Sequence, residues 1–178
     1  NTYFINVLRD AVDKYGFTKP SIGLRELDEH LFDFGLGHKL GTDMLHETRG
    51  NIPTAEYYEK IYGKGWRSTY MMFIGIGQGE IQMSTLQIAN LAAIIANKGY
   101  YYIPHLIKGF KNKEYLIPET FRVKHQSGVD AKYFTPVIDG MEMAVASKWC
   151  GWSTPIPGIV LCGKTGTSQN PPYEDHAV

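Results

Sequence analysis

The chain has 178 residues, and its 18 lysines and arginines balance 18 aspartates and glutamates, so the formal net charge is zero. Hydrophobic residues make up 43% of the sequence, which excludes a disordered chain and predicts a folded core. The balanced charge argues against a general nucleic-acid or membrane-surface binder, because both need a positive excess to meet phosphates. The length fits one domain or one large part of a domain.

Two helical patterns occupy the start of the chain. Apolar residues recur every three or four positions from Thr2 to Tyr15, and again from Pro20 to Phe34, and a glycine follows each pattern. Glycines and prolines then predict a loop-rich region up to about Tyr57. Residues 55–72 are aromatic and irregular, and they indicate no clear element.

The middle of the chain predicts a third helix and a strand. Ser84 or Thr85 can cap a helix that runs to Asn97, where Lys98-Gly99 is a normal helix stop. Residues 100–107 are aromatic and β-branched and predict a strand, part of which a proline confines to a sheet edge. The stretch 68–97 is nearly free of charge but too rich in polar residues to span a membrane.

The last third mixes one helix with short strands. Residues 108–128 are polar and are expected at the surface, and a fourth helix is predicted from Asp130 to Ala146. Ile159 to Cys162 is a short apolar strand by composition, and residues 176–178 look like the start of another. Helices first and strands late favour an α+β fold, or a mixed sheet covered by helices.

The cysteines and histidines predict no metal or cofactor. Cys150 and Cys162 form neither a disulfide framework nor a four-ligand zinc site, although they could pair in an oxidising compartment. Cys162 ends an apolar run and is expected to be a buried thiol. The six histidines show no metal-ligand spacing.

The segment from Gly158 to Thr165 formally matches the phosphate-binding pattern G-x-x-x-x-G-K-[ST]. That motif needs a flexible loop followed at once by a helix. Its middle residues, 159–162, instead prefer extended and buried backbone, and two prolines at 171 and 172 prevent a helix from starting. We therefore reject nucleotide binding.

A second interpretation keeps the strand and continues it through Lys164-Thr-Gly-Thr167. A Lys-Thr-Gly run on a strand beside a catalytic groove is one of three motifs of penicillin-binding proteins and serine β-lactamases. Lys164 supplies a fixed positive charge, the hydroxyls of Thr165 and Thr167 can bind a peptide carboxylate, and Gly166 lets the substrate backbone approach. The backbone N–H of Thr167 can act as an oxyanion donor. The string by itself is a weak signal, because it also occurs on ordinary edge strands.

Further segments in the same order and spacing make the resemblance specific. They are Glu47-Thr-Arg-Gly-Asn-Ile-Pro-Thr54, Ile74-Gly-Ile-Gly-Gln-Gly79, Ser84-Thr-Leu-Gln-Ile-Ala89, Pro104-His105, the helix with Asp139-Gly140-Met141, and Lys164-Thr-Gly-Thr-Ser-Gln169. Together they resemble the transpeptidase domain of class B penicillin-binding proteins, and most of all the elongation type known as penicillin-binding protein 2. The resemblance implies helices packed on a mainly antiparallel sheet, an α+β fold shared with the serine β-lactamases.

The family is described by a Ser-x-x-Lys motif, a Ser-x-Asn motif and the Lys-Thr-Gly strand. None of the seven serines of this sequence is followed three positions later by lysine. Ser168-Gln-Asn170 lies in the wrong place for the second motif and is interpreted as a turn. The resemblance implies instead that Asn1 is the last residue of that motif, because a helix similar to Thr2-Tyr-Phe follows it directly.

The resemblance implies that residues 1–178 are a fragment of a single transpeptidase domain, without its Ser-x-x-Lys portion and its C-terminal strand and helix. The intact enzyme would cross-link D-Ala-D-Ala stem peptides through an acyl-enzyme and bind β-lactams, at the outer face of the cytoplasmic membrane and with other elongation and cell-wall synthesis proteins. The fragment alone would be inactive and would not span the membrane. Alternatives are a D,D-carboxypeptidase or β-lactam sensor of the same fold, or a non-catalytic interaction domain.

Several residues in the matching segments have simple structural interpretations. The glycines of 74–79 indicate a turn where backbones approach closely, and Gln78 and Thr85 are expected to brace the core. His105 is expected to be a hydrogen-bonded structural histidine, and Glu47 and Arg49 can pair at the surface.

Overall fold

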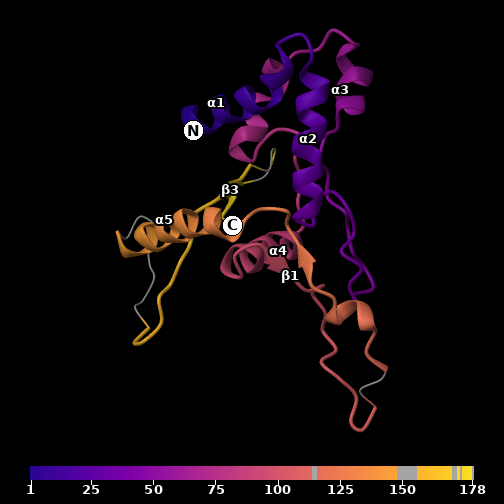
Figure 1. The fold of residues 1–178 in the computed structure, drawn as a ribbon, viewed down its shortest axis with the longest axis vertical. Helices are drawn as coiled ribbons and strands as arrows, with labels where there is room; N and C mark the ends of the chain where they lie inside the picture. Colours follow the sequence, from indigo (N-terminus) through magenta and orange to yellow (C-terminus); the bar gives the residue numbers. More distant parts are fainter. Residues whose placement is uncertain (114–115, 148–155, 170–171, 173, 178) are drawn as a thin grey trace.

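A computed structural model describes residues 1–113, 116–147, 156–169, 172 and 174–177 (Figure 1). The longer helices are α1 (Thr2–Val12), α2 (Pro20–Asp33), α3 (Ala55–Tyr62), α4 (Thr85–Ala96) and α5 (Phe134–Ala146). Short 3-10 helices are η1 (Asp13–Tyr15), η2 (Ser68–Ile76), η4 (Glu119–Arg122) and η5 (Ala131–Tyr133). The strands are β1 (Tyr100–Tyr101), β2 (His125–Gln126), β3 (Thr167–Ser168) and β4 (His176–Ala177).

The described strands form two separate antiparallel pairs. In the first, Tyr100 lies opposite Gln126 and Tyr101 opposite His125. In the second, Thr167 lies opposite Ala177. The fold is therefore α+β, as expected, and its helices account for most of the regular structure.

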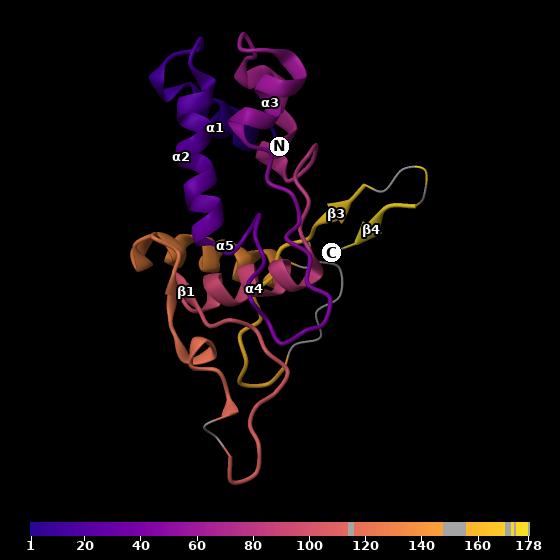
Figure 2. The same ribbon diagram turned by 90° about the vertical axis from the view of Figure 1, so that its right-hand side faces the viewer.

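Two apolar clusters divide the helices. The first cluster joins α1, α2, α3 and η2, and its buried members are Leu8, Val12, Leu24, Ala55, Tyr58, Trp66 and Met71. The second joins α4, β1 and α5 through Leu40, Ile94, Tyr101 and Phe134. Figures 1 and 2 both show α1–α3 at one end of the molecule and α4 and α5 crossing its middle.

Local sequence explains where these helices begin. Pro20 occupies the first turn of α2, where its missing N–H costs nothing, and the Thr54 side chain caps α3 by accepting from the Tyr57 amide. Ser84 and Gln87 form a reciprocal capping box at the start of α4. The helices predicted at 2–15, 20–34, 85–97 and 130–146 are confirmed by α1 with η1, α2, α4, and η5 with α5. The short helix α3 was not predicted.

The strand predictions were less accurate. The strand expected over 100–107 is limited to Tyr100–Tyr101. The strand expected over 159–162 is wrong, because Ile159 forms only an isolated bridge with Ile156, and Val160 is 67% exposed. Its expected continuation through Lys164–Thr167 is also wrong up to Gly166, since β3 begins only at Thr167. A run of apolar residues forms a buried strand only where a neighbouring strand and a core are there to receive it. β4 confirms the strand expected near residue 176.

Two burial predictions also need correction. Cys162 is exposed rather than a buried thiol, because the segment that carries it is not a core strand; Cys150 lies outside the described residues. Residues 108–128 were expected at the surface, but two of them, Ile117 and Phe121, are buried together with Ile103 in a third small cluster. None of the described helices combines the length and the apolar character that a membrane span requires.

Candidate functional site

The segment from Lys164 to Thr167 lies between α5 and the β3–β4 pair, and its residues are exposed. Just before it, the Gly163 amide donates to the carbonyl of Met141 on α5 at 3.1 Å. A Cβ at Gly163 would lie 3.3 Å from a methyl carbon of Val145, so a larger residue would press on the helix. At the other end, Thr167 pairs with Ala177. The segment is thus fixed at both ends and open to solvent between them.

The Lys164 ammonium group binds the residue that follows it. Its Nζ donates to the Thr165 carbonyl at 2.6 Å and to the Thr165 hydroxyl at 3.2 Å. A positive charge and a hydroxyl group therefore lie together on an exposed extended segment just before β3, next to Gly166, which has no side chain to obstruct a ligand. Such a set can bind a carboxylate and supply a proton-binding group beside it.

Asn1 lies apart from this segment. It is the N-cap residue of α1, where its carbonyl accepts from the Ile5 amide at 3.1 Å and its side chain makes no capping bond. Among the described residues no hydrogen bond joins Asn1 to Lys164 or Thr167. The structure therefore brings residues 164–167 together but does not place Asn1 in contact with them.

A buried glutamine, Gln87, holds the framework next to this site. It is 1% exposed, and its Nε2 lies 3.3, 3.2 and 3.1 Å from the carbonyl oxygens of Gly35, His38 and Arg49. Its Oε1 accepts from the Ser84 amide at 2.9 Å. One side chain thus fastens the loop between α2 and α3 to the start of α4. The Ser-x-x-Gln spacing was the available signal, but sequence reasoning assigned the bracing role to Gln78 and Thr85 instead, and Thr85 is exposed.

The segment 47–54 is locked to the residues before α4. The backbones of Asn51 and Gln82 exchange two hydrogen bonds, at 2.7 and 2.8 Å, and the Asn51 side chain donates to the Glu80 carbonyl at 2.7 Å. Gly50 has φ +64°, and a Cβ there would lie 2.3 Å from the Gln82 carbonyl oxygen. Only glycine fits this position, which explains the Arg-Gly-Asn sequence.

Glu47 does not pair with Arg49, contrary to expectation. Its carboxylate accepts from the amides of Leu40, Gly41 and Thr42, so it closes the preceding loop. A carboxylate that caps three backbone amides gains more than one exposed ion pair, which accounts for the difference.

The structural roles expected for His105 and Gly75 are confirmed. The Nδ1 of His105 lies 2.8 Å from the Ile103 carbonyl oxygen, and its ring stacks on Phe121 at 4.6 Å. A Cβ at Gly75 would lie 2.9 Å from the Phe4 carbonyl oxygen, so the backbones of η2 and α1 approach closely there. In the described part of the chain, no group of three or more His, Cys, Asp or Glu residues could hold a metal ion.

The family model for the transpeptidase domain of penicillin-binding proteins matches residues 1–176. The chain belongs to this family. The match spans both apolar clusters and the Lys-Thr-Gly segment, and after Thr165 the described chain forms β3 rather than the helix that a phosphate-binding loop requires.

Several proteins of the PBP2/MrdA type are similar to this chain, which spans less than two fifths of each of the three named here. Peptidoglycan D,D-transpeptidase MrdA of Haemophilus influenzae is 35% identical over 91 residues, which is 51% of this chain and 14% of that protein. The crystal structure of Pseudomonas aeruginosa PBP2 in complex with WCK 5153 is 27% identical, with a TM-score of 0.71, over 99% of this chain and 37% of the solved one. PBP2 from Helicobacter pylori, solved in complex with MreC, is 25% identical, with a TM-score of 0.69, over 97% and 32% of the two chains.

Proposed function

We propose that this chain forms the part of a peptidoglycan D,D-transpeptidase domain that carries the Lys-Thr-Gly strand of the acyl-transfer site. The observation that carries the proposal is the family match over residues 1–176, with Lys164–Thr167 exposed on a segment that is tied to α5 and leads into β3. Residues 1–178 are then one segment of a single domain. Large exposed apolar side chains support this, because Tyr3 is 71% exposed and Phe73 62% exposed.

In this proposal the nucleophile is a serine of a Ser-x-x-Lys motif that is not among the seven serines of the sequence. Its oxygen attacks the carbonyl of the penultimate D-Ala of a stem peptide, and the terminal D-Ala leaves with a proton on its amine. The amine of a second stem peptide then attacks the acyl-enzyme, forms the cross-link and returns the serine hydroxyl. A β-lactam acylates the same serine through its ring carbonyl.

The chain supplies the strand side of the groove in this reaction. Thr165 and Thr167 bind the terminal carboxylate of the stem peptide through their hydroxyls, and the Thr167 amide donates to the developing oxyanion. The Lys164 ammonium group leaves Thr165 and turns toward the serine, where its charge stabilises the acylation step. Gly166 allows the peptide backbone to approach the strand. Asn1 completes the Ser-x-Asn motif from the end of α1.

The location and the partners belong to the same proposal. The enzyme works at the outer face of the cytoplasmic membrane, where peptidoglycan is assembled, together with other cell-wall synthesis proteins. The H. pylori PBP2 complex with MreC supports a partner of that kind, and the family description supports binding of penicillins.

A Lys164→Ala substitution in the full-length protein tests the proposal. We expect acylation by a fluorescent penicillin to slow by about 10²-fold or more, because the charge beside the nucleophile is lost. Lys64→Ala is the matched control, since Lys64 is an exposed lysine in the loop after α3 and its loss should leave the rate unchanged. Circular dichroism checks that both variants keep the fold.

The outcomes separate the candidate functions. Acylation of Lys164→Ala at the unmodified rate would refute the role of Lys164. An unmodified full-length protein that is never acylated would indicate a non-catalytic interaction domain. Acylation followed by release of D-Ala from a pentapeptide, with no cross-linked product when an acceptor amine is present, would identify a D,D-carboxypeptidase.

A further inference from the structure

Residues 106–124 are here named the arm, and its described residues, 106–113 and 116–124, lie at the end of the molecule opposite to α1–α3 (Figure 1). The arm contains four lysines and one arginine against two glutamates, in a chain whose net charge is zero. Its positive charge is therefore local and is offset by acidic residues elsewhere. The described part of the arm packs around Ile117 and Phe121, which are 9% and 8% exposed.

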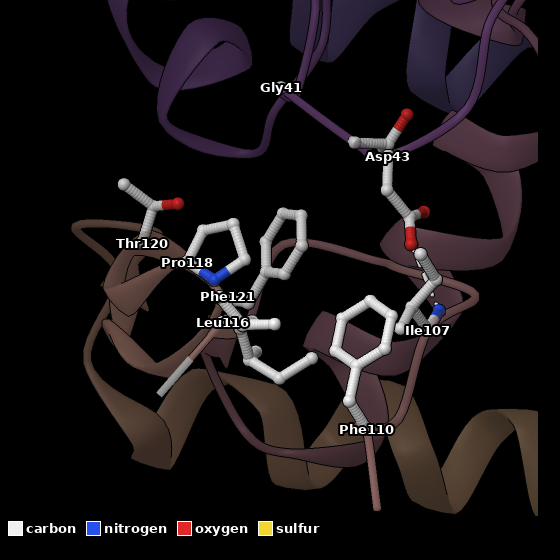
Figure 3. A pocket seen from close by; sticks show the side chains of 10 residues that line it. Gly41, Asp43, Ile107, Phe110, Leu116, Pro118, Thr120 and Phe121 are labelled. Atoms are coloured by element: carbon white, nitrogen blue, oxygen red, sulfur yellow. Dashed lines mark hydrogen bonds between the residues drawn. The ribbon is translucent and has the colours of Figure 1, made fainter. Parts of the chain in front are cut away.

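One side of the arm forms an apolar pocket of about 420 Å³ against the 41–43 loop. Figure 3 shows Phe110, Leu116, Pro118 and Phe121 around one hollow, with Asp43 at its edge. The Asp43 carboxylate accepts from the Leu106 and Ile107 amides at 2.9–3.0 Å, which lowers its pKa and uses its charge to hold the root of the arm. The volume is within the range of about 300–1,000 Å³ that is usual for ligand pockets.

The other side of the arm forms a cationic pocket of about 450 Å³. It is lined by Lys108, Lys111 and Arg122, together with Gly109, Phe110 and Ile117. None of these three cations forms an ion pair with a carboxylate in the described residues. Phe110 and Ile117 belong to both pockets, so the apolar and the cationic hollows are neighbours separated by two side chains.

We propose that the arm is a docking site for an acidic peptide segment of a partner protein, anchored by one apolar side chain. The apolar residue fills the hollow beside Phe110 and Phe121, and the flanking carboxylates bind Lys108, Lys111 and Arg122. Cations beside an apolar pocket complement a segment that alternates acidic and large apolar residues. The hollow beside the buried Ile117 and Phe121 favours the inserted side chain of a peptide, whereas Leu106 and Val123, which are 74% and 47% exposed, would suit a lipid surface and make it the competing occupant in the test.

A random library of 12-residue peptides, selected against the immobilised full-length protein, is the probe. We expect enrichment of peptides that combine acidic residues with an aromatic or aliphatic residue, and the best of them is then titrated by fluorescence anisotropy. Charge reversal by Lys108→Glu with Lys111→Glu should weaken that peptide at least about tenfold and flatten the salt dependence. Phe110→Ala should weaken it to a similar degree with little cost to folding, since Phe110 is 43% exposed.

The matched control is Lys19→Glu with Lys64→Glu, which changes the total charge equally at the far end of the molecule. The proposal is overturned if no acidic peptides are enriched, or if the control weakens binding as much as the arm variant. If Phe110→Ala left the peptide affinity unchanged, binding would depend on charge alone, and the proposed apolar anchor would be refuted. Capture of phosphatidylglycerol vesicles through Lys108 and Lys111, without any peptide binding there, would assign the arm to a membrane surface and overturn it as well.

Discussion

Asp28 places a carboxyl group inside the first apolar cluster. The side chain is 4% exposed on α2, and its Oδ1 has no hydrogen-bond partner. Burial raises the pKa of Asp28 to about 7, and the like charge of Glu56 on α3 adds to the effect. An aspartate in the unfolded chain has its usual pKa near 3.8. The folded state therefore holds a proton that the unfolded state has already lost between these two values.

Because of this difference, the free energy of unfolding falls as the pH rises from about 4 to about 7. Above about pH 7 it no longer changes through Asp28, because the carboxyl group is then ionised in both states. We expect Asp28→Asn to remove this slope. Between about pH 5 and about pH 8, the free energy of unfolding of the unmodified protein should fall by up to roughly 3 kcal/mol relative to the variant. Urea titrations at these pH values measure it. Asp33→Asn, at the exposed end of the same helix, should leave the slope in place; an equal slope in Asp28→Asn would contradict the assignment.

Single residues differ in how far the sequence could predict them. Residues 164–167 could be proposed as site residues because the Lys-Thr-Gly run agrees in order and spacing with the other matching segments, and their role stays a prediction. Gln87 was not, because its partners are carbonyl groups 38 to 52 positions earlier in the chain, and a glutamine in an apolar helix does not reveal them. The placement of Asn1 near the site stays a prediction, since it depends on a Ser-x-Asn motif of which the sequence shows only the asparagine.

At the scale of elements, α2 crosses α1 at a glycine. A Cβ at Gly23 would lie 2.2 Å from the Val12 carbonyl oxygen, which is backbone and cannot move aside cheaply. Gly140 on α5 is also helical, but a Cβ there would meet nothing within 4 Å. The two positions therefore form a matched pair in which the same substitution has opposite consequences.

We expect Gly23→Ala to lower the free energy of unfolding by about 1–3 kcal/mol or more, because the two helices must separate. Gly140→Ala should raise it by up to about 1 kcal/mol, since alanine is the better helix former. Urea midpoints of the two variants make the comparison. If Gly23→Ala left the free energy of unfolding unchanged, the two helices would have to lie farther apart at Gly23 than the structure shows.

Helices were predicted well and strands poorly for one physical reason. A helix satisfies its own backbone, so an apolar period of three to four residues and a capping residue are enough to predict 85–97 and 130–146. A strand depends on a partner that may be far away in the sequence. The apolar run at 159–162 carried no information about that partner, and neither the bridge at Ile156 nor the pairing of β3 with β4 could be predicted from it.

At the scale of the whole molecule, the chain presents one side of the proposed acyl-transfer site. We expect the isolated 178-residue chain to form no adduct with benzylpenicillin, because none of its serines belongs to a Ser-x-x-Lys motif. Intact-mass spectrometry after incubation measures this, with the full-length protein as the positive control. A stoichiometric adduct on the isolated chain would contradict both the proposed nucleophile and the fragment interpretation.

The two apolar clusters divide the helices into two lobes, and the proposed site takes one side from each lobe. Asn1 belongs to α1 in the first cluster, while the Lys164 segment is tethered through Gly163 to α5 in the second. The lobes are joined next to α4 by the contacts of Gln87 and the Asn51–Gln82 bridge, and also by apolar packing, since the Phe34 ring at the end of α2 lies 6.3 Å from the Phe134 ring of α5. Hydrogen bonds of this kind exchange at little net cost, unlike packed side chains. A ligand that contacts both sides of the proposed site would therefore add a further connection between the two lobes and couple them.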